Sequence, residues 1–447
     1  MQKRILSFIS LGCDKNLVDS EKMLGILSEQ GYSFTDDVRE AEACIINTCS
    51  FINDAKEESI QNILDVANLK QEGKLKALIV TGCLAQRYAE EIQDEIPEVD
   101  AIVGINSFHK ISEILAEVLD NKSAVVLDDL SILPAPVSKR VITTGGHFAY
   151  LKISEGCAKH CTYCAIPKIR GDYRSYPMEY LIDEAEKLAQ EGVKELIIVA
   201  QETTLYGVDI YGKKMLPELL NKLCEIPGFV WIRVLYCYPE EITDELIECI
   251  KANKKICNYL DIPMQHCSDK ILKRMGRRTS KADIKALVNK LRVEIPDIAV
   301  RTTFIVGFPG ETEEDFNELL EFVDEMSFDR VGVFTYSPEE DTPAASFANQ
   351  VSEEEKIRRK DELMILQQAV STDIGEETVG KKLLVMIEGK LSDENVYVGR
   401  TYKDAPDVDG YIFVYSQDEL MSGDFAFVTV TGSMEYDLIG EIDNELT

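Results

Sequence analysis

Short apolar runs alternate with amphipathic stretches over residues 5–104. The apolar runs are ILSFISL, ACIINT, ALIVT and AIVG, and the stretches between them include DSEKMLGILSEQ and NDAKEESIQNILDVANL. The runs have the length of buried strands, whereas the stretches between them have helical periodicity. This alternation predicts an open parallel sheet in an α/β domain.

A second series of strand and helix patterns begins at Tyr150, after a stretch at about 122–147 that contains ILPAPVSKR and TTGG. We interpret that stretch as a linker, because proline and glycine interrupt regular elements. Six β/α units follow, too few for the eight of a closed barrel. We therefore expect an open (β/α)6 barrel with its functional groups on the loops after the strands. The six strand candidates are YLKIS, ELIIVA, WIRVLY, YLDIP, VRTTFIVG and VGVFTY.

Helical periodicity ends near residue 375. The chain then shows KKLLVMIEG, NVYVGRTY, GYIFVYS and FAFVTVTGS, which are short strand candidates separated by turn residues. They predict a small antiparallel barrel, so the fold class is α/β with an added β-barrel. We expect an N-terminal domain at 1–122, a linker at 123–143, a central domain at 144–372 and the barrel at 373–447.

The chain is acidic and shows no membrane-spanning pattern. It has 48 Lys and Arg against 80 Asp and Glu, a formal net charge of −32. Such a charge raises solubility, opposes long contacts with a phosphate backbone and favours a basic partner over RNA. No run approaches the ~18 apolar residues of a membrane span, and the start MQKRILSFISLGCDKN has no small-residue cleavage site. We therefore expect a cytoplasmic protein with no membrane contact.

Three cysteines lie close together in EGCAKHCTYCAIP, directly after the first strand candidate of the central series. Cys157, Cys161 and Cys164 have C-x3-C-x2-C spacing. In a reducing compartment such a group is more typical of metal ligands than of disulfides. Three thiolates on one loop suit three irons of a four-iron cluster and leave the fourth iron open for a small molecule. A structural zinc site is the alternative; it usually needs four protein ligands, and no fourth Cys is near, although His160 is a candidate.

This spacing, with the aromatic Tyr163 before the last cysteine, resembles the signature of the radical S-adenosylmethionine (SAM) superfamily. The resemblance implies that SAM chelates the open iron through its amino and carboxylate groups. It also implies that an electron from the reduced cluster cleaves SAM to a 5'-deoxyadenosyl radical, while the protein positions the cofactor and excludes competing reactions.

Three more cysteines end strand candidates of the N-terminal domain: Cys13 in SLGC, Cys49 in NTC and Cys83 in TGC. Parallel sheets place sites at the carboxyl ends of their strands, so these thiols are expected to meet at one edge. Judged by spacing alone, each of these cysteines could equally well be a small buried side chain with no ligand role. Their contexts GCDKN, NTCSF and GCLAQRY resemble the methylthiotransferase family, and the order of domains extends the resemblance over essentially the whole chain. It implies that Cys13, Cys49 and Cys83 hold an auxiliary four-iron cluster and that the C-terminal barrel is a TRAM domain, which is OB-like.

Polar residues at the other strand ends are candidates for holding SAM. A helix cap or a loop hydrogen bond explains each of them equally well, and the family resemblance assigns these positions to the cofactor only as a group. The remaining six cysteines lie in apolar or mixed runs, where a packing role is the simpler interpretation. The candidates for SAM are Gln201, Glu202, Thr203, Arg233, Gln265 and Gly307.

The motifs SLGCDKNLVDSE, EGCAKHCTYCAIPKIRGDYRS and KDAPDVDG resemble the RimO branch of this family. One departure is Asp14, where that branch usually has proline; it lies beside a ligand and does not replace one. The resemblance implies transfer of a methylthio group to the β-carbon of an aspartate in small-subunit ribosomal protein twelve, free or within the ribosome. Two SAM molecules then serve as methyl donor and radical source, with an electron donor such as flavodoxin or ferredoxin. No side-chain nucleophile or acid-base pair is evident or needed.

Two alternatives stay open at this point. One is a tRNA adenosine methylthiotransferase with identical cofactors, and the other is an iron-sulfur protein without enzymatic activity. Residues 375–447 hold 16 Asp and Glu against 5 Lys and Arg, whereas a barrel that binds tRNA is expected to be basic. An acidic barrel suits a basic ribosomal protein, although the acidity of the whole chain weakens this inference. The cysteine loop with an open iron position argues against a mere electron carrier.

Overall fold

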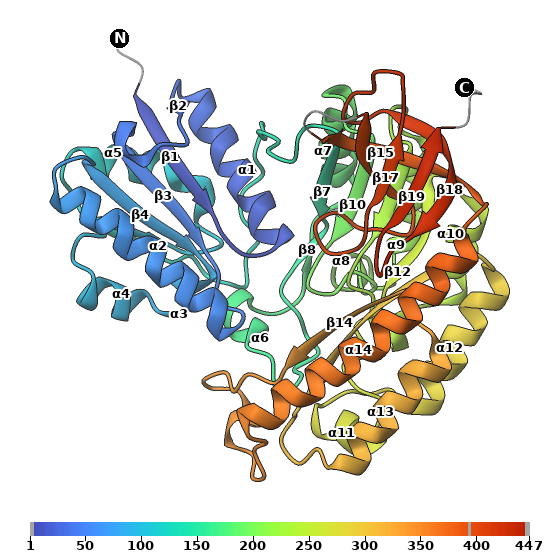
Figure 1. Ribbon diagram of the computed structural model, residues 1–447. Coiled ribbons are helices and arrows are strands. Elements are labelled where there is room, and N and C mark those ends of the chain that lie inside the picture. The colour runs from blue at the N-terminus through green and yellow to red at the C-terminus, as the bar shows by residue number, and fades with distance from the viewer. Residues whose placement is uncertain (1–3, 392–394, 443–447) are drawn as a thin grey trace.

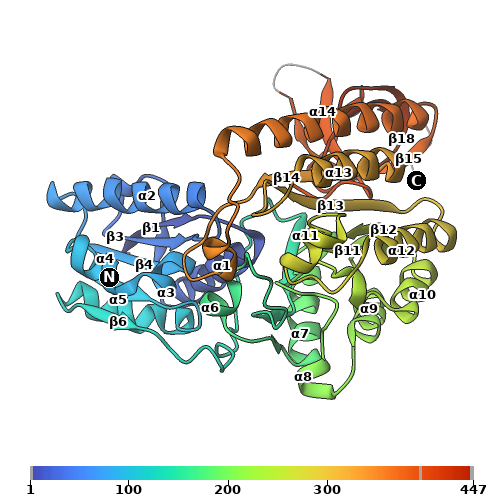
Figure 2. The same ribbon diagram turned by 90° about the horizontal axis from the view of Figure 1, so that it is seen from below.

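The computed structural model describes residues 4–391 and 395–442, and these form three domains (Figure 1). The N-terminal domain and the C-terminal barrel both pack against the central domain. Helix α1 (Asp14–Glu29) lies on the side of the N-terminal domain that faces the central domain, as both views show (Figures 1 and 2). Within the described residues, no helix combines the length and apolarity needed to cross a bilayer.

The N-terminal domain is the open parallel sheet that the sequence predicts. Its strands run in the order β2-β1-β3-β4-β5-β6, and every pair is parallel. β3 and β4 are buried throughout because helices cover both faces. Cys44 and Ile46 face α2, α3 and α4, whereas Ala43 and Ile45 face α1 and α5.

The strands of this domain are β1 Ile5–Ser10, β2 Ser33–Phe34, β3 Ala43–Thr48, β4 Ala77–Gly82, β5 Ala101–Val103 and β6 Ala124–Val126. Its other helices are α2 Asn53–Gln71, α3 Cys83–Arg87, α4 Ala89–Glu95 and α5 Ile111–Leu119, with short 3-10 turns at Val38–Glu40 and Phe108–Lys110.

The central domain is the expected open barrel. Its six parallel strands have the order β14-β13-β12-β11-β10-β7, and β7 and β14 stay apart as the two edges. The outer face packs on helices through an apolar core that runs from Ala149 to Leu363. A two-stranded ribbon, β8 Ser154–Glu155 with β9 Arg174–Ser175, brackets the cysteine loop.

The strands of the barrel sheet are β7 Phe148–Lys152, β10 Glu195–Val199, β11 Trp231–Val234, β12 Ile256–Asp261, β13 Ala299–Val306 and β14 Arg330–Thr335. The helices are α6 Ile166–Arg170, α7 Met178–Gln190, α8 Val208–Tyr211, α9 Leu216–Glu225, α10 Asp244–Ala252, α11 Asp269–Arg274, α12 Lys281–Glu294, α13 Glu313–Met326 and α14 Glu353–Thr378, with 3-10 turns at Pro239–Glu241 and Pro343–Ser346.

The C-terminal domain is a closed barrel of order β15-β16-β17-β19-β18. Neighbouring strands are antiparallel except β17 and β19, which are parallel because β18 lies between them in the chain. The sequence analysis found four of the five strands and missed β19, whose segment alternates too briefly to stand out. The strands are β15 Lys382–Lys390, β16 Val396–Thr401, β17 Ile412–Tyr415, β18 Phe425–Ser433 and β19 Leu438–Ile442.

Two elements extend beyond the boundaries that the sequence suggested. Residues 124–126 lie in the expected linker but form β6, which pairs with β5 at the edge of the N-terminal sheet. A three-residue edge strand is too short to show periodicity. Helix α14 continues past residue 372 to Thr378 because no proline interrupts it.

Candidate functional site

The loop with Cys157, Cys161 and Cys164 leaves the carboxyl end of the first barrel strand. Gly156, before the first cysteine, has a φ of +73°, and a Cβ there would lie 2.2 Å from the carbonyl oxygen of Asp172. Only glycine fits this turn. The N–H of Cys157 donates to the Gly171 carbonyl at 3.2 Å, and the N–H of Cys164 donates to the Cys161 carbonyl at 3.0 Å. Backbone bonds therefore fix where the thiols lie.

Thr162, between the second and third cysteines, anchors the loop to the rest of the barrel. Its N–H donates to the Met275 carbonyl at 2.9 Å, and its hydroxyl donates to the Arg274 carbonyl at 2.8 Å. Its own carbonyl accepts from the N–H of Ala344 at 2.9 Å. The cysteine loop is thereby held between the end of α11 and the turn at Pro343–Ser346.

The three thiols of this loop are free and close enough to interact electrically. None is in a disulfide, and Cys157 and Cys161 are buried. The pKa of Cys157 is raised to about 11 and that of Cys164 to about 12, mainly by burial and in part by the charges of the neighbouring cysteines. Ionised thiolates at this place need a compensating positive group, as iron provides.

The arrangement does not fit a single metal ion. Over the described part of the chain, no three Cys, His, Asp or Glu side chains converge on one ion. A four-iron cluster makes a different demand, because each thiolate binds its own iron. The zinc alternative needed His160 as fourth ligand, and this residue is exposed. The donor set therefore fits the cluster better.

Buried polar atoms without a hydrogen-bond partner lie in the loops that follow β10 and β12. Three of the residues predicted to hold SAM supply such atoms: the Oε1 atoms of Gln201 and Gln265 and the Oε2 atom of Glu202. Gln265 also has a φ of +75°, a strained conformation for a residue other than glycine. Because orphaned buried polar groups are costly, they indicate a bound polar molecule. The mixture of amide and carboxylate groups fits the amino acid and ribose of SAM.

Glu202 is fully buried beside the cysteine loop. Its Oε1 atom accepts from the N–H of Thr204 at 2.9 Å and from the Thr204 hydroxyl. Lys159 Nζ lies 4.0 Å from its Oε2 atom, and Lys159 also pairs with Glu240 and Glu241. Burial nevertheless raises the pKa of Glu202 to about 7.

A Glu202→Gln substitution should stabilise the cofactor-free protein at alkaline pH. The raised pKa means that the folded state holds this proton more tightly, so stability falls as pH rises from about 4.5 to about 7. From ~1.4 kcal/mol per pKa unit, the variant should gain about 3 kcal/mol at pH 8 and under about 1 kcal/mol at pH 5. Urea unfolding at both pH values measures the difference. Equal gains at the two pH values would contradict the assignment.

The other three residues predicted to hold SAM are explained by contacts within the protein. The Thr203 hydroxyl donates to the Leu235 carbonyl at 2.6 Å, tying two strand ends together. Gly307 has a φ of +72°, and a Cβ there would lie 2.3 Å from Lys356 Cγ, so close packing explains this glycine. Neither residue offers an unpartnered side-chain group.

Arg233 is the penultimate residue of β11, so it lies next to the strand end from which it was predicted to reach SAM. The structure uses its side chain elsewhere. Its guanidinium pairs with Glu195 at 2.7 Å and donates to the Tyr402 carbonyl of the C-terminal barrel at 2.6 Å. Its hydrogen bonds thus serve the contact between two domains.

The sequence analysis missed three residues at the cysteine loop. Lys159 lies within the loop, and Tyr238 and Arg277 lie beside it. Tyr238 Oη lies 3.6 Å from Cys161 Sγ, and its ring lies 4.3 Å from the guanidinium of Arg277. The Nε and Nη1 atoms of Arg277 are buried without partners, so they are unpaired donors near the cysteine loop. The only sequence signal was MGRRT, which a helix C-terminus explains equally well.

The N-terminal cysteines follow three neighbouring strands. Cys13 precedes α1 after β1, Cys49 follows β3, and Cys83 begins α3 after β4; these strands are adjacent in the sheet. Burial and the charge of Cys83 together raise the pKa of Cys49 to about 12, and the charge of Cys13 contributes to raising the pKa of both Cys49 and Cys83. The three thiols therefore share one edge of the sheet, as predicted.

Asn16 connects the loops that carry these cysteines. Its Nδ2 atom donates to the Leu11 carbonyl at 3.1 Å and to the Thr48 carbonyl at 2.9 Å. Its Oδ1 atom accepts from the Cys83 thiol at 3.7 Å. Gly12 lets the backbone beside Cys13 approach Cys49 closely, because a Cβ at Gly12 would lie 2.8 Å from Cys49 Cβ. A single buried amide thus fixes the spacing of the three loops.

Neither Asp14 nor the six remaining cysteines disturbs the two groups of predicted cysteine ligands. Asp14 is the first residue of α1 and pairs with Lys15 at 2.8 Å, so its place beside Cys13 removes no ligand. The remaining cysteines pack in the cores or between outer helices. They are Cys44, Cys224, Cys237, Cys249, Cys257 and Cys267.

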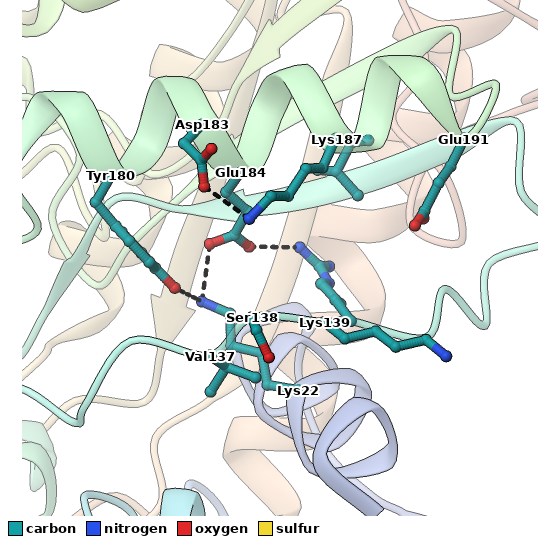
Figure 3. Close-up of a pocket in the computed structure, with 11 residues that line it drawn as sticks. Lys22, Val137, Ser138, Lys139, Tyr180, Asp183, Glu184, Lys187 and Glu191 are labelled. Atoms are coloured by element: carbon teal, nitrogen blue, oxygen red, sulfur yellow. Dashed lines mark hydrogen bonds and ion pairs between the residues drawn. The ribbon is translucent and has the colours of Figure 1, made fainter. Parts of the chain in front are cut away.

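Buried ion pairs hold α1 against the central domain. Lys22 of α1 donates to Tyr180 Oη at 3.2 Å and to Glu184 at 3.0 Å, and Arg140 pairs with Glu184 at 3.1 Å (Figure 3). These groups line a cavity of about 90 Å³ that contains none of the predicted site residues. Lys22 and Arg140 pair with Glu184, and Lys187 pairs with Asp183, so most of its lining charges are paired and we assign it to the domain contact.

Three family models match the chain in succession. They are uncharacterized protein family UPF0004 at 6–104, the radical SAM superfamily at 151–323 and the TRAM domain at 379–442. A protein of Lachnoclostridium phytofermentans named ribosomal protein uS12 methylthiotransferase RimO is 60% identical over 97% of this chain and 98% of its own length. A protein of Clostridioides difficile with the same name is 53% identical over 98% of each chain. The chain belongs to the RimO family of radical SAM methylthiotransferases.

Each cysteine set of this RimO family member lies in its own family model: Cys13, Cys49 and Cys83 in the first, and Cys157, Cys161 and Cys164 in the second. A solved structure also resembles it in fold. The radical SAM methyltransferase TsrM from Kitasatospora setae, with tryptophan and a SAM analog bound, has a TM-score of 0.54 and 14% identity, covering 86% of this chain and 78% of that one. At that identity the likeness extends to the fold alone.

Proposed function

We propose that this chain adds a methylthio group to the β-carbon of an aspartate in ribosomal protein uS12. The observation that carries the proposal is the identity of 49–60% over nearly the whole length to proteins of that name. No relative among these is named as a tRNA-modifying enzyme. The two cysteine sets support the proposal, because the transfer needs two distinct iron-sulfur sites.

The site residues divide between the two clusters. We propose Cys157, Cys161 and Cys164 as ligands of the cluster that binds SAM, and Cys13, Cys49 and Cys83 as ligands of the auxiliary cluster. When bound, these clusters and SAM supply the radical and methylthio chemistry. Gln201, Glu202 and Gln265 orient SAM through their free polar atoms. Because these polar atoms are buried, SAM held by them would be shielded from water.

The charge of the C-terminal barrel fits a basic protein substrate. Several of its carboxylates are used within the protein, such as Asp404, which pairs with Arg330, and Asp409, which pairs with Arg301. Exposed carboxylates attract basic proteins and repel RNA. Among the residues that the structure describes in the barrel, those that remain exposed are Asp407, Asp418, Glu419, Glu435 and Glu441.

We further propose a small reduced electron carrier, flavodoxin or ferredoxin, as the source of electrons. The clusters need single electrons at low potential, which carriers of this class supply. A cytoplasmic location fits an enzyme whose substrate is a ribosomal protein.

The test is anaerobic reconstitution of the protein, followed by reaction with SAM, dithionite and uS12 and by mass spectrometry of intact uS12 and its peptides. The expected result is a mass gain of one methylthio group on one aspartate. A parallel reaction uses tRNA as the substrate. Deoxyadenosine formation with unmodified uS12 and methylthiolated tRNA would overturn the proposed substrate, whereas absence of deoxyadenosine would overturn the radical chemistry itself.

A further inference from the structure

One arginine of the central domain reaches across to the auxiliary cysteines. Arg170 ends α6, yet its guanidinium is buried against the N-terminal domain. Its Nη2 atom donates to Asn16 Oδ1 at 2.5 Å and to Cys83 Sγ at 3.6 Å. Its Nη1 atom donates to Glu155 at 2.9 Å and lies 3.5 Å from Asp19. The Nη1 end of the guanidinium thus faces carboxylates. The Nη2 end faces the Cys83 thiol and the Asn16 amide, which connects the cysteine loops.

Arg170 shares these carboxylates with a second buried cation. Lys152 pairs with both Asp19 and Glu155, so Lys152 and Arg170 together balance the two buried anions. The Nη1 end of Arg170 therefore completes this charge balance. The Nη2 end remains directed at Asn16 and Cys83.

Helix α6 gives this contact a fixed length. It begins at Ile166, two residues after Cys164, and ends at Arg170. Ala165, just before the helix, and Ile169 within it pack directly on Cys83. Helix α6 lies beside α3 (Figure 1). Five residues of α-helix span ~7.5 Å. One short rigid element therefore has a ligand of the SAM-binding cluster at one end and contacts a ligand of the auxiliary cluster at the other.

We propose that Arg170 is a positioning residue that sets the seating and the reduction potential of the auxiliary cluster from across the domain contact. Hydrogen bonds to cluster sulfur and nearby positive charge raise the potential of an iron-sulfur cluster. Arg170 supplies both to Cys83, and through Asn16 it also braces the loops of Cys13 and Cys49. This inference rests on the proposed auxiliary cluster.

The experiment isolates that cluster in the full chain. The parent protein has Cys157, Cys161 and Cys164 replaced by alanine and keeps Arg170. Its Arg170→Met variant is compared with it by iron content, EPR spectrum and potentiometric titration. The expected result is a lower midpoint potential and a changed EPR spectrum in the variant. A parent without iron would overturn the proposed ligand set itself, whereas a loaded parent whose potential and spectrum match those of the variant would overturn the role of Arg170.

Two further variants separate positioning from a general loss of structure. Arg140→Met removes another buried arginine of the same domain contact, one that pairs with Glu21 and Glu184 and touches no cysteine. It should leave the potential unchanged, and an equal shift would overturn the proposal. Arg170→Lys keeps the charge and the pair with Glu155 if Arg170→Met fails to fold. A single ammonium cannot serve both ends of the contact, so a smaller downward shift is expected, and no shift would overturn the proposal.

Discussion

A Cys157→Ala variant loses reductive cleavage of SAM, with 5'-deoxyadenosine reduced by more than about 100-fold. Changing groups that only support metal ligands typically costs ~10–100-fold, so loss of a ligand exceeds that range. The loop cannot rearrange to replace the thiol, because the Cys157 N–H is held by the Gly171 carbonyl and Thr162 is bonded to Met275 and Arg274. Chromatography of deoxyadenosine after reduction with dithionite measures the effect.

The matched control for that variant is Cys267→Ala. Cys267 is buried in the same domain, but its thiol donates to the Glu318 carbonyl at 3.4 Å, on the helical side of the barrel. Its substitution should leave deoxyadenosine formation within about twofold of the parent, since buried cysteine behaves as a small apolar group. Full deoxyadenosine formation by Cys157→Ala would show that this thiol holds no iron.

A Cys83→Ala variant separates the two halves of the chemistry. It should still form deoxyadenosine, because the loop of Cys157 to Cys164 belongs to another domain and keeps its own backbone bonds. Methylthiolated uS12 should fall by more than about 100-fold, again because a ligand counts for more than its supporting groups. Mass spectrometry of uS12 and chromatography of deoxyadenosine in one reaction give both values.

Cys44→Ala is the control for the auxiliary set. Cys44 lies in β3 of the same sheet, is fully buried and packs against α2, α3 and α4. Its substitution should leave both products unchanged. If Cys83→Ala still methylthiolates uS12, the auxiliary cluster does not depend on this thiol and the proposed ligand set is wrong.

The cysteine positions could be predicted because a parallel sheet places all its carboxyl ends on one edge. Cys13, Cys49 and Cys83 each follow an apolar run, and this was enough to bring them together without knowledge of the strand order. The structure adds that β1, β3 and β4 are direct neighbours. The pattern of runs therefore predicted that the N-terminal set converges, whereas the spacing C-x3-C-x2-C predicted the central set.

Side chains that act across domains could not be predicted in the same way. Arg170 contacts Asn16, 154 positions earlier in the chain, and no local pattern marks such a pair. Arg233 does lie next to the end of β11, but its contacts with Glu195 and the Tyr402 carbonyl could not be predicted from the run WIRVLY. Gln201, Glu202 and Gln265 could be proposed as SAM contacts from the sequence because they lie in the loops after two strand candidates, whereas Arg277 follows a helix.

The three successive family matches suggest a modular protein, but helix α6 limits that modularity. A chimaera that exchanges residues 6–104 for those of a relative would also have to match the surface formed by Ala165, Ile169 and Arg170, because Cys83 packs on it. Exchange of the C-terminal barrel faces a different requirement, namely carboxylates that pair with Arg301 and Arg330. The natural unit for recombination of the two iron-sulfur sites is therefore the N-terminal domain together with the segment from Cys157 to Arg170.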